Sequence, residues 1–192
     1  VHVFLPFNGR LVVGGSFVAI GGQIHTGIAI GDGTTFEDLG GGVDDAVFAL
    51  CEFQGKLVAA GDFLAAGDRD ARRIALWDGA AWQRMGPGFD ERVTSLAVYR
   101  GDLYAAGWFK NSGSTSCRHV ARWDGQAWLP VALGIDGFVN ALVVHGDRLI
   151  AGGWKREDPS PPIRAAADAH GPARLDRPGV NDPARMGEGP QD

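Results

Sequence analysis

Three loops of the chain carry polar residues that could bind a ligand. The segment GDRDARR (67–73) alternates acids and arginines, KNSGSTSCRH (110–119) offers amide, hydroxyl and basic groups, and VAIGGQIHTG (18–27) contributes an imidazole. Proteins place binding residues on loops that a rigid scaffold holds in position. The predicted binding residues are therefore His25, Asp68, Arg69, Asp70, Arg73, Asn111, Ser114, Arg118 and His119.

The same residue types form no catalytic or metal-binding pattern. The five histidines do not pair at metal-ligand spacing, and Cys51 and Cys117 lie in no short cysteine motif. The phosphate-binding pattern GxxxxGK[ST] is absent. We therefore predict no metal ion, no cofactor and no catalytic residue in this chain.

Composition restricts the partners. The net charge of −5 comes without a basic stripe, which argues against nucleic acid as a partner. No apolar run approaches the ~18 residues that a membrane-spanning helix needs. The 30 glycines, about twice the usual share of roughly 7%, are typical of an all-β protein with many turns.

These loops are parts of an internal repeat of 46 residues. Leucine recurs at this spacing at four positions, and many other residue types follow the same register. The repeat divides the chain into units 1–46, 47–92, 93–138 and a truncated unit 139–154. The recurring leucines and the glycines that follow them are Leu11, Leu57, Leu103, Leu149, Gly15, Gly61, Gly107 and Gly153.

Each full unit contains four short apolar runs that turn residues separate. In the second unit these runs are VFALCEF, LVAAGDF, RIALWDG and AAWQRM. Repeated units of four antiparallel strands and about 40–50 residues indicate the blades of a β-propeller. We therefore predict an all-β fold of four-stranded antiparallel meanders, with about three and a third blades and an incomplete ring over 1–154.

Two sets of repeated residues are assigned structural roles. An aspartate followed by glycine makes the turn between the third and fourth strands, because Asp bonds its own backbone and Gly accepts positive φ. The large indole rings fill the space between adjacent sheets. These residues are Asp32, Asp78, Asp124, Trp77, Trp82, Trp123 and Trp128.

The sequences LVVGG and LIAGG, followed by a strand that leads into WDGxxW, resemble the Kelch-like repeats of galactose-oxidase-type propellers. The similarity covers 1–154 and is greatest to bacterial versions with recurring GGxF and WDGxxW. It implies a propeller scaffold, and from it alone we expect an extracytoplasmic or secreted protein. The units differ from the pattern where unit one has GDG in place of WDG and where units two and three have Ala-Gly in place of Gly-Gly.

Antiparallel strands place the loops after the second and fourth strands on one face. These loops vary between units, whereas the opposite loops are short and nearly constant, so the variable face is predicted to bind a protein or a carbohydrate. The function predicted is a non-enzymatic recognition module, as a fragment of a larger protein. The alternative function is part of a propeller enzyme, namely a sugar oxidase, lyase or hydrolase, whose catalytic residues lie on missing blades. A cluster of His, Tyr or Arg side chains that converge on the propeller axis would favour the enzyme.

The repeat stops near residue 155. The segment 155–192 holds seven of the ten prolines and no aromatic residue, so it is predicted to be a disordered tail. Three and a third blades cannot close a ring, and an open blade edge is expected to allow self-association.

Overall fold

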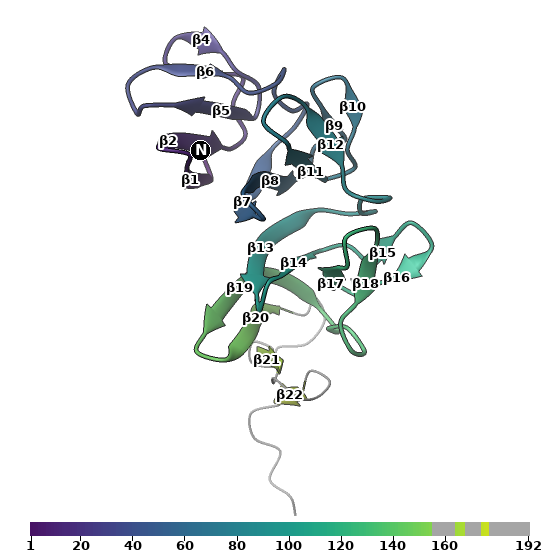
Figure 1. Cartoon of the computed structure of the whole chain (residues 1–192). Coiled ribbons are helices and arrows are strands. Elements are labelled where there is room, and N and C mark those ends of the chain that lie inside the picture. Colours follow the sequence, from purple (N-terminus) through teal and green to yellow (C-terminus); the bar gives the residue numbers. More distant parts are fainter. Residues whose placement is uncertain (155–163, 168–173, 177–192) are drawn as a thin grey trace, which may run out of the picture.

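A computed structural model describes residues 1–154, 164–167 and 174–176. All regular elements in these ranges are β-strands, and four sheets have four antiparallel strands each (Figure 1). The prediction of an all-β chain built from four-stranded antiparallel sheets is confirmed.

The first two sheets have the same strand order. The first contains β1 (Val3–Phe7), β2 (Arg10–Gly14), β5 (Ile28–Gly31) and β6 (Phe36–Asp38), paired in that order. The second contains β7 (Val47–Phe53), β8 (Lys56–Gly61), β11 (Ile74–Trp77) and β12 (Trp82–Arg84). Both are meanders in which each strand pairs with its neighbours in the sheet order.

The third and fourth sheets repeat this pattern. The third contains β13 (Val93–Tyr99), β14 (Asp102–Gly107), β17 (Val120–Trp123) and β18 (Trp128–Pro130). The fourth contains β19 (Phe138–His145), β20 (Arg148–Trp154), β21 (Arg164–Ala167) and β22 (Arg174–Asp176). The predicted disordered tail falls mostly outside the described residues, but the two segments of it that are described are the strands β21 and β22.

A two-stranded hairpin fills the loop between the second and third strands of each of the first three sheets. The sequence analysis described these loops only as variable between units, and it did not predict the short hairpins. The three hairpins pair β3 (Ala19–Ile20) with β4 (Gln23–Ile24), β9 (Ala65–Ala66) with β10 (Arg69–Asp70), and β15 (Asn111–Ser112) with β16 (Thr115–Ser116).

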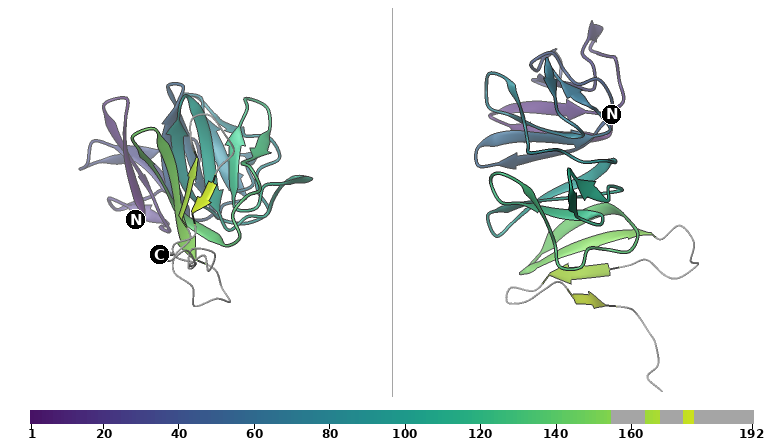
Figure 2. Two further views of the ribbon diagram at one scale, coloured as in Figure 1. Left: turned by 90° about the horizontal axis from the view of Figure 1, so that it is seen from below. Right: turned by 90° about the vertical axis from the view of Figure 1, so that its right-hand side faces the viewer.

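The sheets follow one another as stacked layers from the N-terminus to β20 (Figures 1 and 2). Their first strands β1, β7, β13 and β19 are in contact one with the next. Neighbouring residues of a strand therefore face different sheets: Leu57 and Ala59 of β8 pack toward the first sheet, whereas Val58 and Ala60 pack toward the third. This two-sided burial explains why the strand sequences are apolar without alternation.

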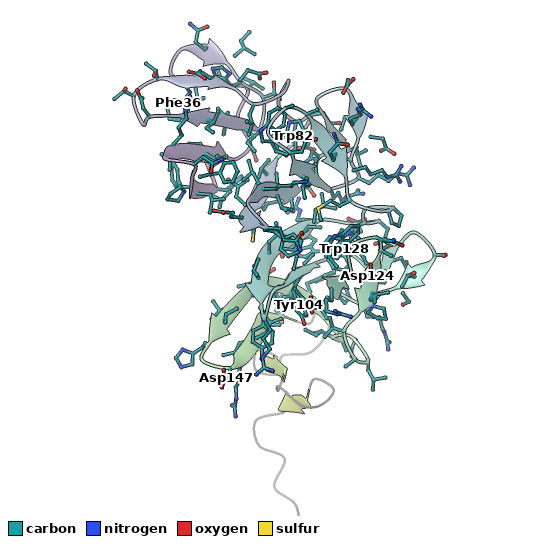
Figure 3. The ribbon with its side chains drawn as sticks, viewed as in Figure 1. Phe36, Trp82, Tyr104, Asp124, Trp128 and Asp147 are labelled. Atoms are coloured by element: carbon teal, nitrogen blue, oxygen red, sulfur yellow. The ribbon has the colours of Figure 1, made fainter. Side chains whose placement is uncertain are left out.

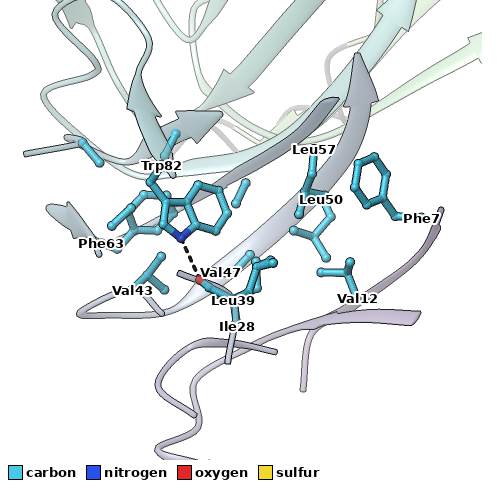
Figure 4. Close-up of a cluster of buried hydrophobic side chains, with 14 residues drawn as sticks. Phe7, Val12, Ile28, Leu39, Val43, Val47, Leu50, Leu57, Phe63 and Trp82 are labelled. Atoms are coloured by element: carbon cyan, nitrogen blue, oxygen red, sulfur yellow. Dashed lines mark hydrogen bonds between the residues drawn. The ribbon is translucent and has the colours of Figure 1, made fainter. Parts of the chain in front are cut away.

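One tryptophan joins each of the second and third sheets to the sheet before it. The ring of Trp82 lies in the apolar cluster between the first two sheets, and its indole Nε1–H donates to the Leu39 carbonyl at 2.8 Å (Figure 4). Trp128 repeats the arrangement one sheet later (Figure 3), donating to the Met85 carbonyl at 3.1 Å. Both rings are almost fully buried.

The other repeated residues have clear steric or hydrogen-bonding causes. A Cβ at Gly61 or Gly107 would collide with the carbonyl oxygen of Ala46 or Arg92, so the first strand of each sheet approaches these positions too closely for a side chain. Each turn aspartate accepts two backbone N–H groups, as Asp78 does from Ala80 and Ala81, both at 2.9 Å. Asp32 and Asp124 make the same pair of hydrogen bonds to the two backbone N–H groups of their own turns.

Candidate functional site

The predicted binding residues lie on or beside three separate hairpins. Asp68, Arg69 and Asp70 are exposed on the β9–β10 hairpin, where Asp70 pairs with Arg72 and Arg84 at 3.3 Å. On the next hairpin, Ser114 is exposed and Asn111 donates to Asp90 at 2.8 Å. The structure does not gather these side chains into one cluster, and their role in binding stays a prediction.

Four further predicted residues lie at or near the ends of these loops, and two of them are buried. His25 and His119 are only 7% and 8% exposed. His119 packs edge-on against Phe138, and burial lowers the pKa of its imidazole. Arg73 is half-buried and donates to the Phe89 carbonyl at 3.0 Å, whereas Arg118 is exposed.

Aspartates of the inter-sheet linkers hold two of the hairpins. Asp44 accepts the backbone N–H groups of Leu64 and Ala65 at 2.8 and 2.9 Å. Asp90, 46 residues later, accepts those of Lys110 and Asn111, both at 2.9 Å. The hairpins therefore have a common shape despite their different sequences.

A second group of side chains lies closer together than the predicted residues. They occupy the start of the first strand or the end of the second strand of successive sheets, beside the repeated glycines. Their rings and one guanidinium follow each other across all four sheets with separations of 4.7 to 5.6 Å. We call this group the aromatic row: His2, Phe48, Arg92, Trp108, Phe138 and Trp154.

Arg92 occupies the middle of the aromatic row. Its guanidinium lies 4.7 Å from the ring centre of Phe48 and 4.9 Å from that of Trp108. It also donates twice to the Asp62 carboxylate, with Nε to Oδ1 at 3.0 Å and Nη2 to Oδ2. Two ring faces and a bidentate carboxylate fix the position of this side chain, because each restricts a different motion of the planar group.

The rest of the row is partly accessible to solvent. Trp154 is 45% exposed, and Phe48, Trp108 and Phe138 are half-buried. The indole Nε1–H of Trp108 makes a long hydrogen bond of 3.4 Å to Asn140, so it is only weakly engaged. The row thus presents ring edges and one large exposed ring on a rigid support.

Sequence reasoning missed the aromatic row, although a signal was present. Position 16 of the unit holds Ser16, Asp62, Trp108 and Trp154, directly after glycines that never change. A variable position beside an invariant one marks a site that the fold does not dictate. A prediction based on variation in whole loops does not detect single variable positions at strand ends.

The described residues include two cysteine thiols but no cluster of metal ligands. They contain no group of three or more His, Cys, Asp or Glu side chains that could hold a metal ion. Burial raises the pKa of the Cys51 thiol to about 11, with a smaller effect of Glu52 in the same direction. Burial also raises the pKa of Cys117. Both thiols are therefore held in the weakly nucleophilic protonated form at neutral pH.

Among the residues that the structure describes, no helix has the length and apolar character needed to cross a membrane. No protein-family model matches the chain, and no curated protein matches it significantly.

Proposed function

We propose that the chain is a segment of a β-propeller of the Kelch-like type. Three features support the proposal: the 46-residue repeat, the four-stranded meander of each unit and the contact between first strands of successive sheets. In such a ring the first strands lie nearest the axis, so the aromatic row would run around the axial opening on the variable-loop face.

We further propose that the chain is a non-enzymatic module that recognises a protein or a carbohydrate through this face. The aromatic row carries the proposal. Half-exposed Trp and Phe rings around a fixed Arg have the composition of binding hot spots, because large rigid groups lose little conformational entropy when a ligand covers them. An extracytoplasmic location fits a recognition role and rests on the Kelch-like resemblance.

The proposal is tested by substituting the exposed end of the row. Immobilised chain is screened against a glycan array and a displayed peptide library, and the best binder is titrated by calorimetry. Trp154→Ala is expected to weaken binding at least about tenfold. The control is Phe4→Ala, since Phe4 is also exposed (60%) but lies on β1, outside the row.

Two results would refute the recognition role of the row. One is the absence of any binder from both libraries. The other is equal affinity of the Trp154→Ala variant and the unsubstituted chain for the binder that is found.

One contact favours the alternative function, a propeller enzyme acting on sugars. His2 Nε2 lies 2.8 Å from Ser16 Oγ at the start of the row, and a basic nitrogen that bonds a hydroxyl is the arrangement that activates a nucleophile. Hydrolysis of nitrophenyl glycosides or esters that disappears in Ser16→Ala would support this function. Hydrolysis that is absent or unaffected by the substitution would eliminate it.

The exposed sheet faces support self-association as a further proposal. Phe4 on the first sheet is 60% exposed, and Val143 on the fourth sheet is 56% exposed. The positions equivalent to Val143 in the second and third sheets, Cys51 and Ala97, pack against the following sheet. Sedimentation of the chain and of a Phe4→Lys variant tests self-association through these faces. If it occurs, the variant is expected to sediment as a smaller species than the unsubstituted chain.

A further inference from the structure

A groove lies between the second and third sheets, lined by residues of the short turns and of the strands beside them. Its volume is about 280 Å³. Phe53 and Met85 are buried in its lining, and Trp123 is half-buried there. Lys56 and Gln83 add polar groups from the second sheet, and Asp124, labelled in Figure 3, adds a carboxylate from the third.

The same position between the first and second sheets carries an ion pair. Arg10 and Glu37, which precede Lys56 and Gln83 by one repeat, are joined at 3.0 Å. Arg10 also donates to the Ile30 carbonyl at 3.4 Å. The two side chains are thereby committed to each other, and Arg10 also to the backbone.

The position between the third and fourth sheets also carries an ion pair. Asp102 forms a salt bridge with Arg122 at 2.9 Å. Asp102 lies one repeat after Lys56, and Arg122 lies one repeat after Leu76. The middle groove differs from both neighbours. Its equivalent residues cannot form such a pair, because Gln83 is neutral and Leu76 is apolar. The side chain of Lys56 makes no hydrogen bond or salt bridge with the described residues, and its charge contributes to lowering the pKa of Asp78.

The middle groove therefore has hydrogen-bonding groups that are available to a ligand. Lys56 offers its ammonium donors. Gln83 uses its amide N–H on Asp78 at 3.0 Å, which leaves its carbonyl oxygen as an acceptor. Asp124 uses Oδ1 for the turn N–H groups of Gln126 and Ala127, so its second oxygen is not occupied by the turn.

We infer that this groove binds a sugar unit. A pyranose has an apolar C–H face that can lie on the indole of Trp123, and its hydroxyl groups both donate and accept hydrogen bonds. The lining supplies a donor in Lys56 and acceptors in Gln83 and Asp124. Arg84 and Asp102 of the lining already form ion pairs with residues outside it, Asp70 and Arg122. The remaining charges, Lys56 and Asp124, are of opposite sign, and this balance favours an uncharged sugar over an anionic one.

The inference is tested on the full chain with glucose, galactose and N-acetylglucosamine and with a trisaccharide of each. Saturation-transfer NMR detects binding, and intrinsic fluorescence gives the affinity. The decisive variant is Lys56→Arg with Gln83→Glu, which reproduces the ion pair of the first sheet across this groove. We expect it to lower the affinity for the bound sugar about tenfold or more.

Two controls separate this site from others. Glu37→Gln breaks the corresponding pair at the first groove and is expected to leave the affinity unchanged. Leu133→Ala changes a side chain that is 84% exposed and lies outside both the groove and the aromatic row, and it is also expected to leave the affinity unchanged. The row is tested separately by the Trp154→Ala variant, so failure of the row and failure of the groove are distinguishable. Denaturant unfolding verifies that each variant folds.

Three outcomes would overturn the inference. The first is no saturation transfer to any of the sugars. The second is unchanged affinity in the double variant, and the third is an equal loss of affinity in the Leu133→Ala control.

Discussion

The role of Trp82 as the link between the first two sheets predicts the largest loss of stability from a single substitution at a repeated position. Its ring is 2% exposed, and its Nε1–H meets the Leu39 carbonyl of the preceding unit. Trp82→Ala removes a large buried ring and is expected to lower the free energy of unfolding by about 3–5 kcal/mol. Trp82→Phe leaves a smaller ring and removes the indole donor, but the Leu39 carbonyl keeps its hydrogen bond from the Gly42 N–H at 3.2 Å, so the expected loss is smaller, about 1–2 kcal/mol.

The repeat itself provides the matched control. Phe36 occupies the same position in the first unit, where it is only half-buried and donates no hydrogen bond. Phe36→Ala should therefore lower the free energy of unfolding by less than about half as much as Trp82→Ala, because folding buries less apolar surface of Phe36 than of Trp82.

Urea unfolding followed by far-UV circular dichroism measures all three variants. The circular dichroism signal is preferable to fluorescence alone, because the substitutions remove an emitter. The expected order of destabilisation is Trp82→Ala, then Trp82→Phe, then Phe36→Ala. Equal losses for Trp82→Ala and Phe36→Ala would refute the packing role of the indole ring.

Three further predictions follow from hydrogen bonds and burial. Backbone N–H groups lower the pKa of Asp32, Asp78 and Asp124 in the folded state. Their contribution to the free energy of unfolding is therefore complete above the unfolded pKa of about 4 and is lost as pH falls below it. Urea unfolding between pH 7 and pH 3 should show this loss, and Asp78→Asn should reduce the dependence of the unfolding free energy on pH. Asp90→Ala frees the amides of Lys110 and Asn111, so hydrogen exchange should accelerate there and not at the hairpin held by Asp44; equal acceleration at both hairpins would contradict a local role. The raised pKa of Cys51 predicts slow alkylation by iodoacetamide at pH 8 compared with a free cysteine, measured by mass spectrometry, and a rate equal to that of free cysteine would contradict the burial effect.

The repeated positions made the strands predictable. The run VFALCEF became β7 and VTSLAVY became β13 with the expected bounds, because the same apolar run and the polar turn after it recur in each unit. The Asp-Gly turns were also predictable, since their cause lies within a few residues of chain. Gly33, Gly79 and Gly125 all have positive φ, as that turn requires.

The hairpins and the aromatic row depend on contacts that are distant in sequence. The β9–β10 hairpin is fixed by Asp44 from the preceding linker, some 20 residues away, so its own sequence gives little indication of a strand. Arg92 was not recognised as part of a site, because its partners Phe48 and Asp62 come from another sheet. In the tail, β22 follows β18 at the repeat spacing without an aromatic residue, which is why its composition indicated disorder.

The stacking of successive sheets is tested most directly by nuclear Overhauser effects from the indole N–H protons of Trp82 and Trp128. The structure predicts cross-peaks to Leu39 for Trp82 and to Met85 for Trp128, each in the preceding unit. Cross-peaks confined to residues of the tryptophan's own sheet would contradict the stacked arrangement.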